Sequence, residues 1–143
     1  MPQVPRRRGR RPTAPTQADG EQERRAWLTI RVDFGEQRYL GPGKIALLEL
    51  ISKHGSIAAA GKEMGMSYRR AWLLVDEINQ TFREPLVEKQ MGGSGGGGAR
   101  LTKLGRDVVG RYRAIEGAAT SASAADLRAL KASLAGRGER NDL

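Results

Sequence analysis

Four consecutive residues, Ser67, Tyr68, Arg69 and Arg70, have the side chains best suited to recognition chemistry in this sequence. Each arginine can donate two hydrogen bonds to O6 and N7 of a guanine, and the two hydroxyls can bond a phosphate or a base edge. If these residues begin a helix, the helix N-terminus also favours a phosphate. The cluster predicts a contact with nucleic acid, and ordinary solvation of the arginines is the alternative.

The charge of the chain favours the same partner. Its 143 residues include 25 lysines and arginines against 16 acidic residues, which gives a formal net charge of +9. So basic a surface seeks a polyanion, with nucleic acid ahead of an acidic membrane surface. The lack of cysteine excludes disulfides and thiolate metal sites and fits a cytoplasmic location. No apolar run approaches the roughly 20 residues that span a bilayer, so we expect no membrane contact.

Two short helices joined by a tight turn are predicted around the cluster. Ser56 is a good N-cap for a helix over 57–64, and Ser67 can cap a second helix over 67–81. Gly65 suits the turn between them, because glycine adopts positive φ without strain. The cluster would then lie at the N-terminal end of the second helix.

Small side chains are needed where two such helices meet, and residues 57–61 (Ile-Ala-Ala-Ala-Gly) supply them. Met64 and Met66 flank the turn, while Ala71 and Leu74 on the second helix would face the core. This combination predicts a helix-turn-helix, in which the N-terminal end of the second helix reaches base edges. A plain helical hairpin within another fold is the alternative.

Before these helices, the sequence predicts a strand and another helix. Ile30, Val32 and Phe34 alternate with charged residues, which is the period of a half-buried strand over 27–34. Apolar residues at helical spacing then predict a helix over 43–53.

After the helix-turn-helix, two short apolar runs flank a glycine-rich segment at 92–98. An interdomain linker has such a composition, but the symmetric flanking runs favour a β-hairpin with a flexible tip. Lys89 and Arg100 flank the tip and can neutralise phosphates beside the helix. The hairpin would be the wing of a mostly α-helical fold with a small β wing, a winged helix-turn-helix.

A last long helix over 103–119, capped by Thr102, is expected to join two copies of the chain as a homodimer. Its apolar stripe predicts a dimerisation surface formed by Leu104, Val108, Tyr112 and Ile115. The chain would thus divide into a disordered basic tail (1–25), a DNA-binding domain with its dimerisation helix (26–120) and a weakly helical or disordered tail (121–143). Arg8-Gly9-Arg10-Arg11-Pro12 in the first tail looks like a minor-groove AT-hook core, but a solvated or purely electrostatic tail is the favoured interpretation.

No catalytic or metal site is predicted. His54 is the sole histidine and lies at a helix end, where an imidazolium complements the helix dipole. Asp76 and Glu77 are adjacent on a helix and point about 100° apart, which makes a poor acid–base pair. We therefore expect a protein that is not an enzyme and takes no cofactor.

Several motifs together resemble the DNA-binding domain of the ModE-type molybdate-responsive regulators and, more distantly, the LysR-type domain. They are Gly55-Ser56-Ile57-Ala58-Ala59-Ala60, Gly65-Met66-Ser67-Tyr68-Arg69-Arg70-Ala71-Trp72, Leu86-Val87-Glu88-Lys89, the run from Gly92 to Gly98, and Arg100-Leu101-Thr102-Lys103-Leu104-Gly105. Over about residues 27–118, the resemblance implies a winged helix-turn-helix, a dimer through the last long helix and transcriptional control. It also implies that Ser67, Tyr68, Arg69 and Arg70 are the recognition residues.

The resemblance does not extend to a molybdate sensor. Full-length family members carry C-terminal oxyanion-binding modules, whereas the residues after 119 are too few for a domain of about 50 residues or more. We expect no direct binding of molybdate. The predicted function is a sequence-specific regulator on double-stranded DNA. A partner that heterodimerises with a full-length regulator and a protein that coats DNA without sequence preference are the alternatives.

Overall fold

The short helices lie between two small hairpins along the chain. The computed structural model describes residues 26–90 and 98–136. In them, four strands and five helices follow in the order β1 (Val32–Gly35), β2 (Arg38–Leu40), α1 (Pro42–His54), α2 (Ile57–Glu63), α3 (Tyr68–Thr81), β3 (Val87–Gln90), β4 (Gly98–Leu101), α4 (Lys103–Ala122) and α5 (Ala124–Ala132). β1 pairs with β2 and β3 with β4, both antiparallel. This is the predicted fold, a winged helix-turn-helix.

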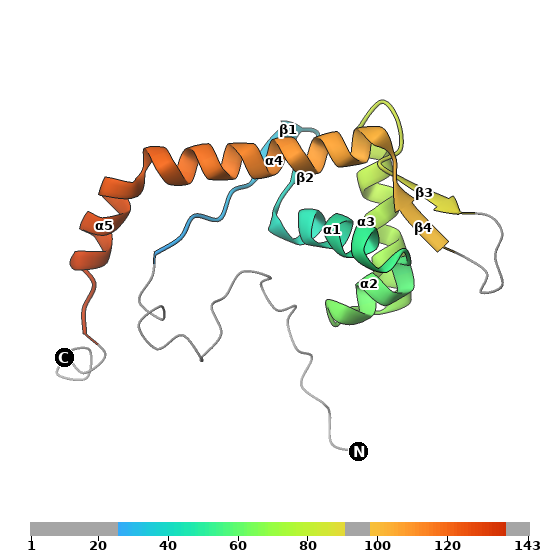
Figure 1. Ribbon diagram of the computed structural model, residues 1–143, viewed down its shortest axis with the longest axis horizontal. Helices are drawn as coiled ribbons and strands as arrows, with labels where there is room; N and C mark the ends of the chain where they lie inside the picture. The colour runs from blue at the N-terminus through green and yellow to red at the C-terminus, as the bar shows by residue number, and fades with distance from the viewer. Residues whose placement is uncertain (1–25, 91–97, 137–143) are drawn as a thin grey trace, which may run out of the picture.

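The helices form a cluster and an extension. α1, α2 and α3 pack together beside the N-terminal half of α4, and the β3–β4 hairpin projects from that end (Figure 1). The C-terminal half of α4 and α5 run away from the cluster. Within residues 26–90 and 98–136, no helix is both long and apolar enough to cross a membrane.

Side-chain caps start α2, α3 and α4, as the sequence predicts. The hydroxyls of Ser56, Ser67 and Thr102 each accept a hydrogen bond from the backbone N–H three residues further on, at 3.0–3.1 Å. Each bond satisfies a donor that the first turn of a helix leaves without a partner. α1 ends at Gly55, which lies in the left-handed region with a φ of 68°.

α2 and α3 cross closely because small residues line their contact. Ala60 and Ala71 are fully buried. A Cβ placed on Gly61 would lie 2.8 Å from the Cβ of Ala71, nearer than real Cβ contacts come. The chain turns between the helices at Gly65, whose φ is 73°. Ala58 is exposed, so the contact depends on Ala60 and Gly61 among the small residues of this segment.

One hydrophobic core joins the helices to the base of the wing. It includes the predicted apolar face of α1, the inner face of α3 and one tyrosine from α4. Its largest fully buried side chains are Ile45, Leu47, Leu48, Ile51, Ile78, Leu86 and Tyr112.

The first predicted strand is shorter than expected. Residues 26–31 form no strand, and β1 pairs with β2, a strand that the sequence analysis did not predict. Phe34 is 42% exposed and does not face the core; its ring contacts that of Phe82, 5.8 Å away between centroids. Glu36 and Gln37 make the turn at positive φ, 54° and 63°. Glycine or asparagine usually fills such positions, so the residue types here carry no hairpin signal.

The glycine-rich segment connects the two strands of a hairpin, as predicted, and is not an interdomain linker. β3 and β4 pair along their whole length. The N–H of Ala99 donates to the carbonyl of Gly55 at 2.9 Å, which attaches β4 to the end of α1. Of the predicted tip, residues 92–98, the structure describes Gly98 alone. The predicted tail over 1–25 and its AT-hook-like stretch lie outside the described residues, as does the end of the C-terminal tail.

Asn79 on α3 holds the first strand of the wing. Its Oδ1 accepts hydrogen bonds from the backbone N–H groups of Leu86 (2.9 Å) and Val87 (3.0 Å). Its Nδ2 donates to the carbonyl of Val87 at 3.1 Å. Because both partner residues are buried in the core, their backbone groups depend on this amide rather than on water.

We expect Asn79→Ala to lower the free energy of unfolding by about 2–4 kcal/mol, since it leaves buried backbone donors without a partner. Asn79→Asp keeps the acceptor for both N–H groups but places a carboxylate oxygen against the carbonyl of Val87, so it should be less stable than the wild-type chain and more stable than Asn79→Ala. Urea unfolding followed by circular dichroism measures both variants, with the exposed neighbour Gln80→Ala as control. If Asn79→Ala were as stable as Gln80→Ala, the hydrogen bonds of Asn79 to β3 would contribute nothing to stability.

Candidate DNA-binding surface

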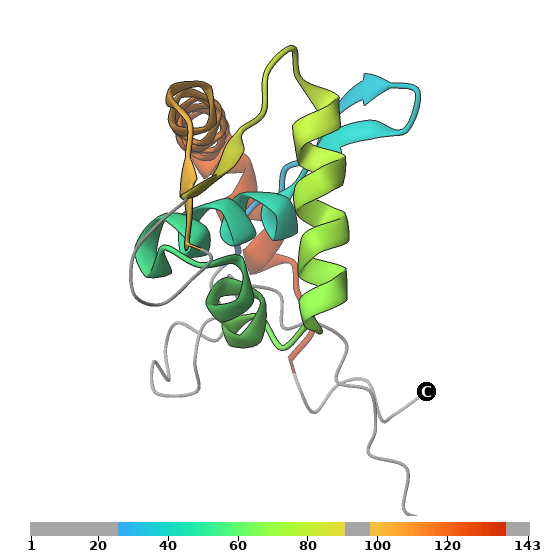
Figure 2. The same ribbon diagram turned by 90° about the vertical axis from the view of Figure 1, so that its right-hand side faces the viewer.

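The N-terminal end of α3 carries the residues that the sequence predicts to contact nucleic acid. Tyr68, Arg69 and Arg70 are exposed, and so is Ser67. The Ser67 oxygen accepts the capping bond from the Arg70 N–H at 3.1 Å, and its hydroxyl hydrogen can still donate to a phosphate. α3 runs along the edge of the helix cluster with α2 beside its N-terminal end (Figure 2). The N-terminal end of α3 is therefore accessible from outside the molecule.

α3 has a buried face and an outer face. Ala71, Val75 and Ile78 are buried against the core. The helical period places a second set of residues on the opposite side, all of them exposed: Arg69, Leu73, Asp76 and Gln80. Arg70 lies about 100° around the helix from Arg69 and so falls on a flank of this outer face.

The wing residue Lys89 lies beside the start of α3. Its Nζ is 4.5 Å from the ring centroid of Trp72, a cation–π contact. The same ring meets Tyr68 edge-on, with 6.0 Å between centroids. Trp72 itself is half-buried. Its ring joins the wing to the recognition end of the helix.

Arg100 is placed differently from Lys89. The register pairs Glu88 with Arg100 and Lys89 with Ala99, so the two basic residues lie on opposite faces of the hairpin. Arg100 Nε donates to Glu88 Oε1 at 2.7 Å. The structure therefore brings Lys89 to α3 and gives Arg100 a carboxylate partner.

His54 has a partner beyond the helix dipole. Its Nε2 shares a hydrogen bond with Glu63, which links the ends of α1 and α2. That bond, with a contribution from the charge of Lys53, lowers the pKa of Glu63. Within the described ranges, no three or more His, Cys, Asp or Glu residues are grouped to hold a metal ion.

The predicted dimerisation stripe of α4 is divided between core and surface. Leu104 and Val108 are half-buried and pack against the core of their own chain. Tyr112 is 1% exposed, which places it inside that core and out of reach of a second copy. Its hydroxyl donates to the carbonyl of Ile30 at 2.6 Å, and burial raises its pKa. Ile115, one turn further on, is 47% exposed.

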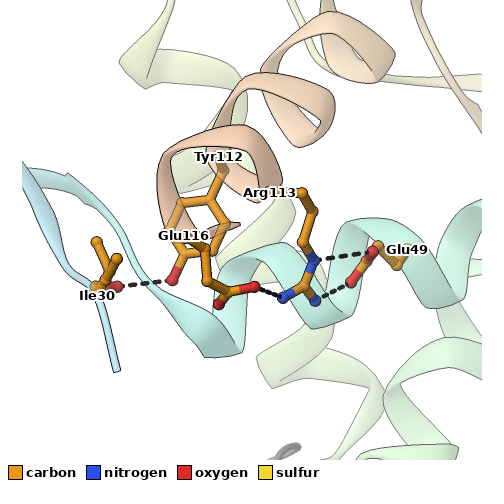
Figure 3. Close-up of polar contacts among 5 residues, drawn as sticks. All are labelled: Ile30, Glu49, Tyr112, Arg113 and Glu116. Carbon is orange, nitrogen blue, oxygen red and sulfur yellow. Dashed lines mark hydrogen bonds and ion pairs between the residues drawn. The ribbon is translucent and has the colours of Figure 1, made fainter. Parts of the chain in front are cut away.

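Next to this tyrosine, Arg113 fastens α4 to α1. Its guanidinium donates to both carboxylate oxygens of Glu49 on α1, and to Glu116 Oε1 at 2.7 Å (Figure 3). The bonds to Glu49 and Glu116 raise the pKa of Arg113, with burial opposing them. Neither this ion pair nor the role of Asn79 was predicted from the sequence. Arg113 and Glu49 lie 64 residues apart in the chain, and Asn79 bonds backbone groups seven and eight residues later, outside its own helix.

Sequence comparison relates the chain to molybdenum-linked proteins. No protein-family model matches it. It is 46% identical over 91 residues to the molybdenum transport protein ModE of Azotobacter vinelandii, which covers 64% of this chain and 33% of that protein. It is 37% identical over 87 residues to the DNA-binding transcriptional dual regulator ModE of Escherichia coli K12, covering 61% and 33%. The chain is homologous to ModE regulators.

A second kind of relative shares this similarity. The molybdenum-pterin-binding protein MopA of Rhodobacter capsulatus is 45% identical over 83 residues, which covers 58% of this chain and 31% of that protein. The chain thus spans about a third of the length of these ModE and MopA relatives. By name they are regulators, a transport protein and a binding protein, and not enzymes.

We expect Arg113→Lys to lower the free energy of unfolding by about 0.5–1 kcal/mol, because lysine cannot bind both oxygens of Glu49 at once. The effect stays modest since the side chains of Arg113 and Glu49 are 37% and 40% exposed. Thermal unfolding measures it, with the exposed neighbour Arg111→Lys as control. If both substitutions had the same effect, the bidentate pair would contribute nothing specific.

Proposed function

We propose that the chain is a sequence-specific regulator of transcription that binds double-stranded DNA through the domain formed by residues 26–120. The observation that carries the proposal is the exposed N-terminal end of α3, which carries Arg69 and Arg70; one turn on, the wing residue Lys89 contacts the ring of Trp72. In a helix-turn-helix, this end of the second helix enters the major groove. Arginine can then read guanine, while Ser67 and Tyr68 bond phosphates or base edges.

Two further observations support this proposal. The net charge of +9 suits a polyanion. A homologue from Escherichia coli K12 is named a DNA-binding transcriptional dual regulator. The names of the relatives also refer to molybdenum, so the binding assay below includes an arm with molybdate.

Within the wing, Lys89 and Arg100 should contribute unequally. Lys89 stands beside the recognition helix, where its ammonium can meet a phosphate next to the groove. Arg100 would have to exchange its bond with Glu88 for a phosphate. We expect Lys89 to make the stronger phosphate contact.

Replacing Arg69 or Arg70 with alanine should weaken binding to the preferred site by about 1–3 kcal/mol if each reads a base. The site is first selected from random duplexes at about 0.15 M salt, where screening leaves exposed charge contacts weak. Fluorescence anisotropy then compares the variants on the selected and random duplexes, with and without molybdate. Arg128→Ala on α5 is the matched control, because it removes an exposed arginine away from α3 and from the proposed dimer surface.

The same titration separates the competing roles. Loss on the selected duplex alone assigns base reading to the arginine, whereas equal loss on all duplexes assigns a phosphate contact. If the wild-type chain selects no sequence at all, the protein coats DNA without preference and the proposal fails.

We also propose that two copies join along α4 and place their α3 helices in successive major grooves. Ile115 supports this, because it is an exposed apolar residue on the part of α4 that extends from the cluster. Leu104 and Val108 lie on the same stripe but pack against the core of their own chain, so only their exposed parts can belong to the proposed surface. Half-sites about 34–36 Å apart, or a multiple of that, would follow.

Ile115→Asp should shift the chain toward the monomer, because a dimer would have to bury the new carboxylate. Sedimentation velocity over a range of protein concentrations measures the change. Leu73→Asp on α3 is the control, since it places the same charge on a surface that the dimer would leave open. A wild-type chain that sediments as a monomer at every concentration would contradict the dimer.

A further inference from the structure

Leu73 is an unusual residue for the outer face of α3. Its side chain is 58% exposed, and it lies between Arg69 one turn before it and Asp76 and Gln80 after it. Single exposed leucines are common on proteins. This one lies at the centre of the face of α3 that would meet DNA under the proposed function. There, contact with an apolar group of the DNA would remove its side chain from water.

We propose that Leu73 is a specificity-determining residue that contacts the 5-methyl group of a thymine in the major groove. The inference rests on the proposed function, since it requires α3 to lie in that groove. Thymine is the base that presents a methyl group on the major-groove edge, and an aliphatic side chain recognises it by excluding water.

The position of Leu73 relative to Arg69 predicts where that thymine lies. The two residues are four apart on α3, which separates them by about 6 Å along the helix axis. Base pairs follow one another about every 3.4 Å along the duplex. A thymine read by Leu73 should therefore lie within about two base pairs of the base that Arg69 reads.

A protein partner fits this leucine less well than DNA does. A stable protein interface buries about 800 Å² on each partner, and the neighbours of Leu73 on this face are charged or amide side chains. The exposed leucines of α5, Leu130 and the nearby Leu134, lie on the extension and not on this face. Basic residues at the start of α3 instead match a polyanion.

The test removes one methyl group at a time from the DNA. A preferred duplex is selected from a random library with the full wild-type chain, and each thymine in it is then replaced by uracil, which lacks only the 5-methyl group. At one thymine per half-site we expect affinity to fall about fourfold, the factor for burying one methyl group. The thymines at other positions should show little change.

Leu73→Ala should abolish the effect of uracil at that position, while its affinity for the uracil duplex stays close to that of the wild-type chain. Leu130→Ala is the matched control, because it shortens a leucine on α5 that is 65% exposed, and it should keep the fourfold effect. An undiminished effect in Leu73→Ala would overturn the proposal, and so would a selected site with no methyl-sensitive thymine. Failure to select any sequence would instead remove the proposed function, and this inference with it.

Discussion

The close approach of α2 to α3 sets the position of the residues on α3 that form the proposed DNA-binding surface. A Cβ on Gly61 would lie 2.8 Å from the Cβ of Ala71, and both positions belong to a close-packed interior. A larger side chain at either would push α3 outward along its length. Because the N-terminal end of α3 carries Arg69 and its other end carries Asn79, such a shift would displace the reading residues and the wing together. The constraint is one of volume, and charge plays no part in it.

Hydrogen bonds join the strands β3 and β4 to the helices α3 and α1. Asn79 binds the backbone at the start of β3, and the Ala99 N–H binds the carbonyl of Gly55 at the end of α1. Lys89 then rests on the ring of Trp72, so a residue of the wing touches a residue of α3 directly. These contacts lie at the base and along one face of the hairpin. A duplex that met α3 would therefore meet the described strands β3 and β4 in a defined position.

Local features of the sequence predicted most of the helical architecture, and the parts missed either carry no recognisable local signal or depend on distant partners. Ser67 as a cap and Gly65 as a turn are set by residues within four positions, so their chemistry is visible in the sequence. The β1–β2 hairpin turns through residue types that carry no hairpin signal. The proximity of Lys89 and Arg100 in the sequence suggested a shared role, but strand register placed them on opposite faces. Tyr112 fitted an apolar stripe, but its side chain is buried in the core of its own chain, and its hydroxyl bonds the carbonyl of Ile30, far away in the chain.

α4 changes its role along its length, and this has a consequence for any dimer built on it. Up to Tyr112 its apolar face belongs to the core of one chain; its C-terminal half runs away from the cluster (Figure 1). Arg113 lies at that boundary and binds Glu49 on α1. In the proposed dimer, this ion pair and the shared core would fix the orientation of each α4 helix relative to α1. The packing of α1 on α2, and of α2 on α3, would in turn fix the position of α3. The spacing of the two recognition helices would then be set by packed helices, so a fixed distance between half-sites follows from the fold itself.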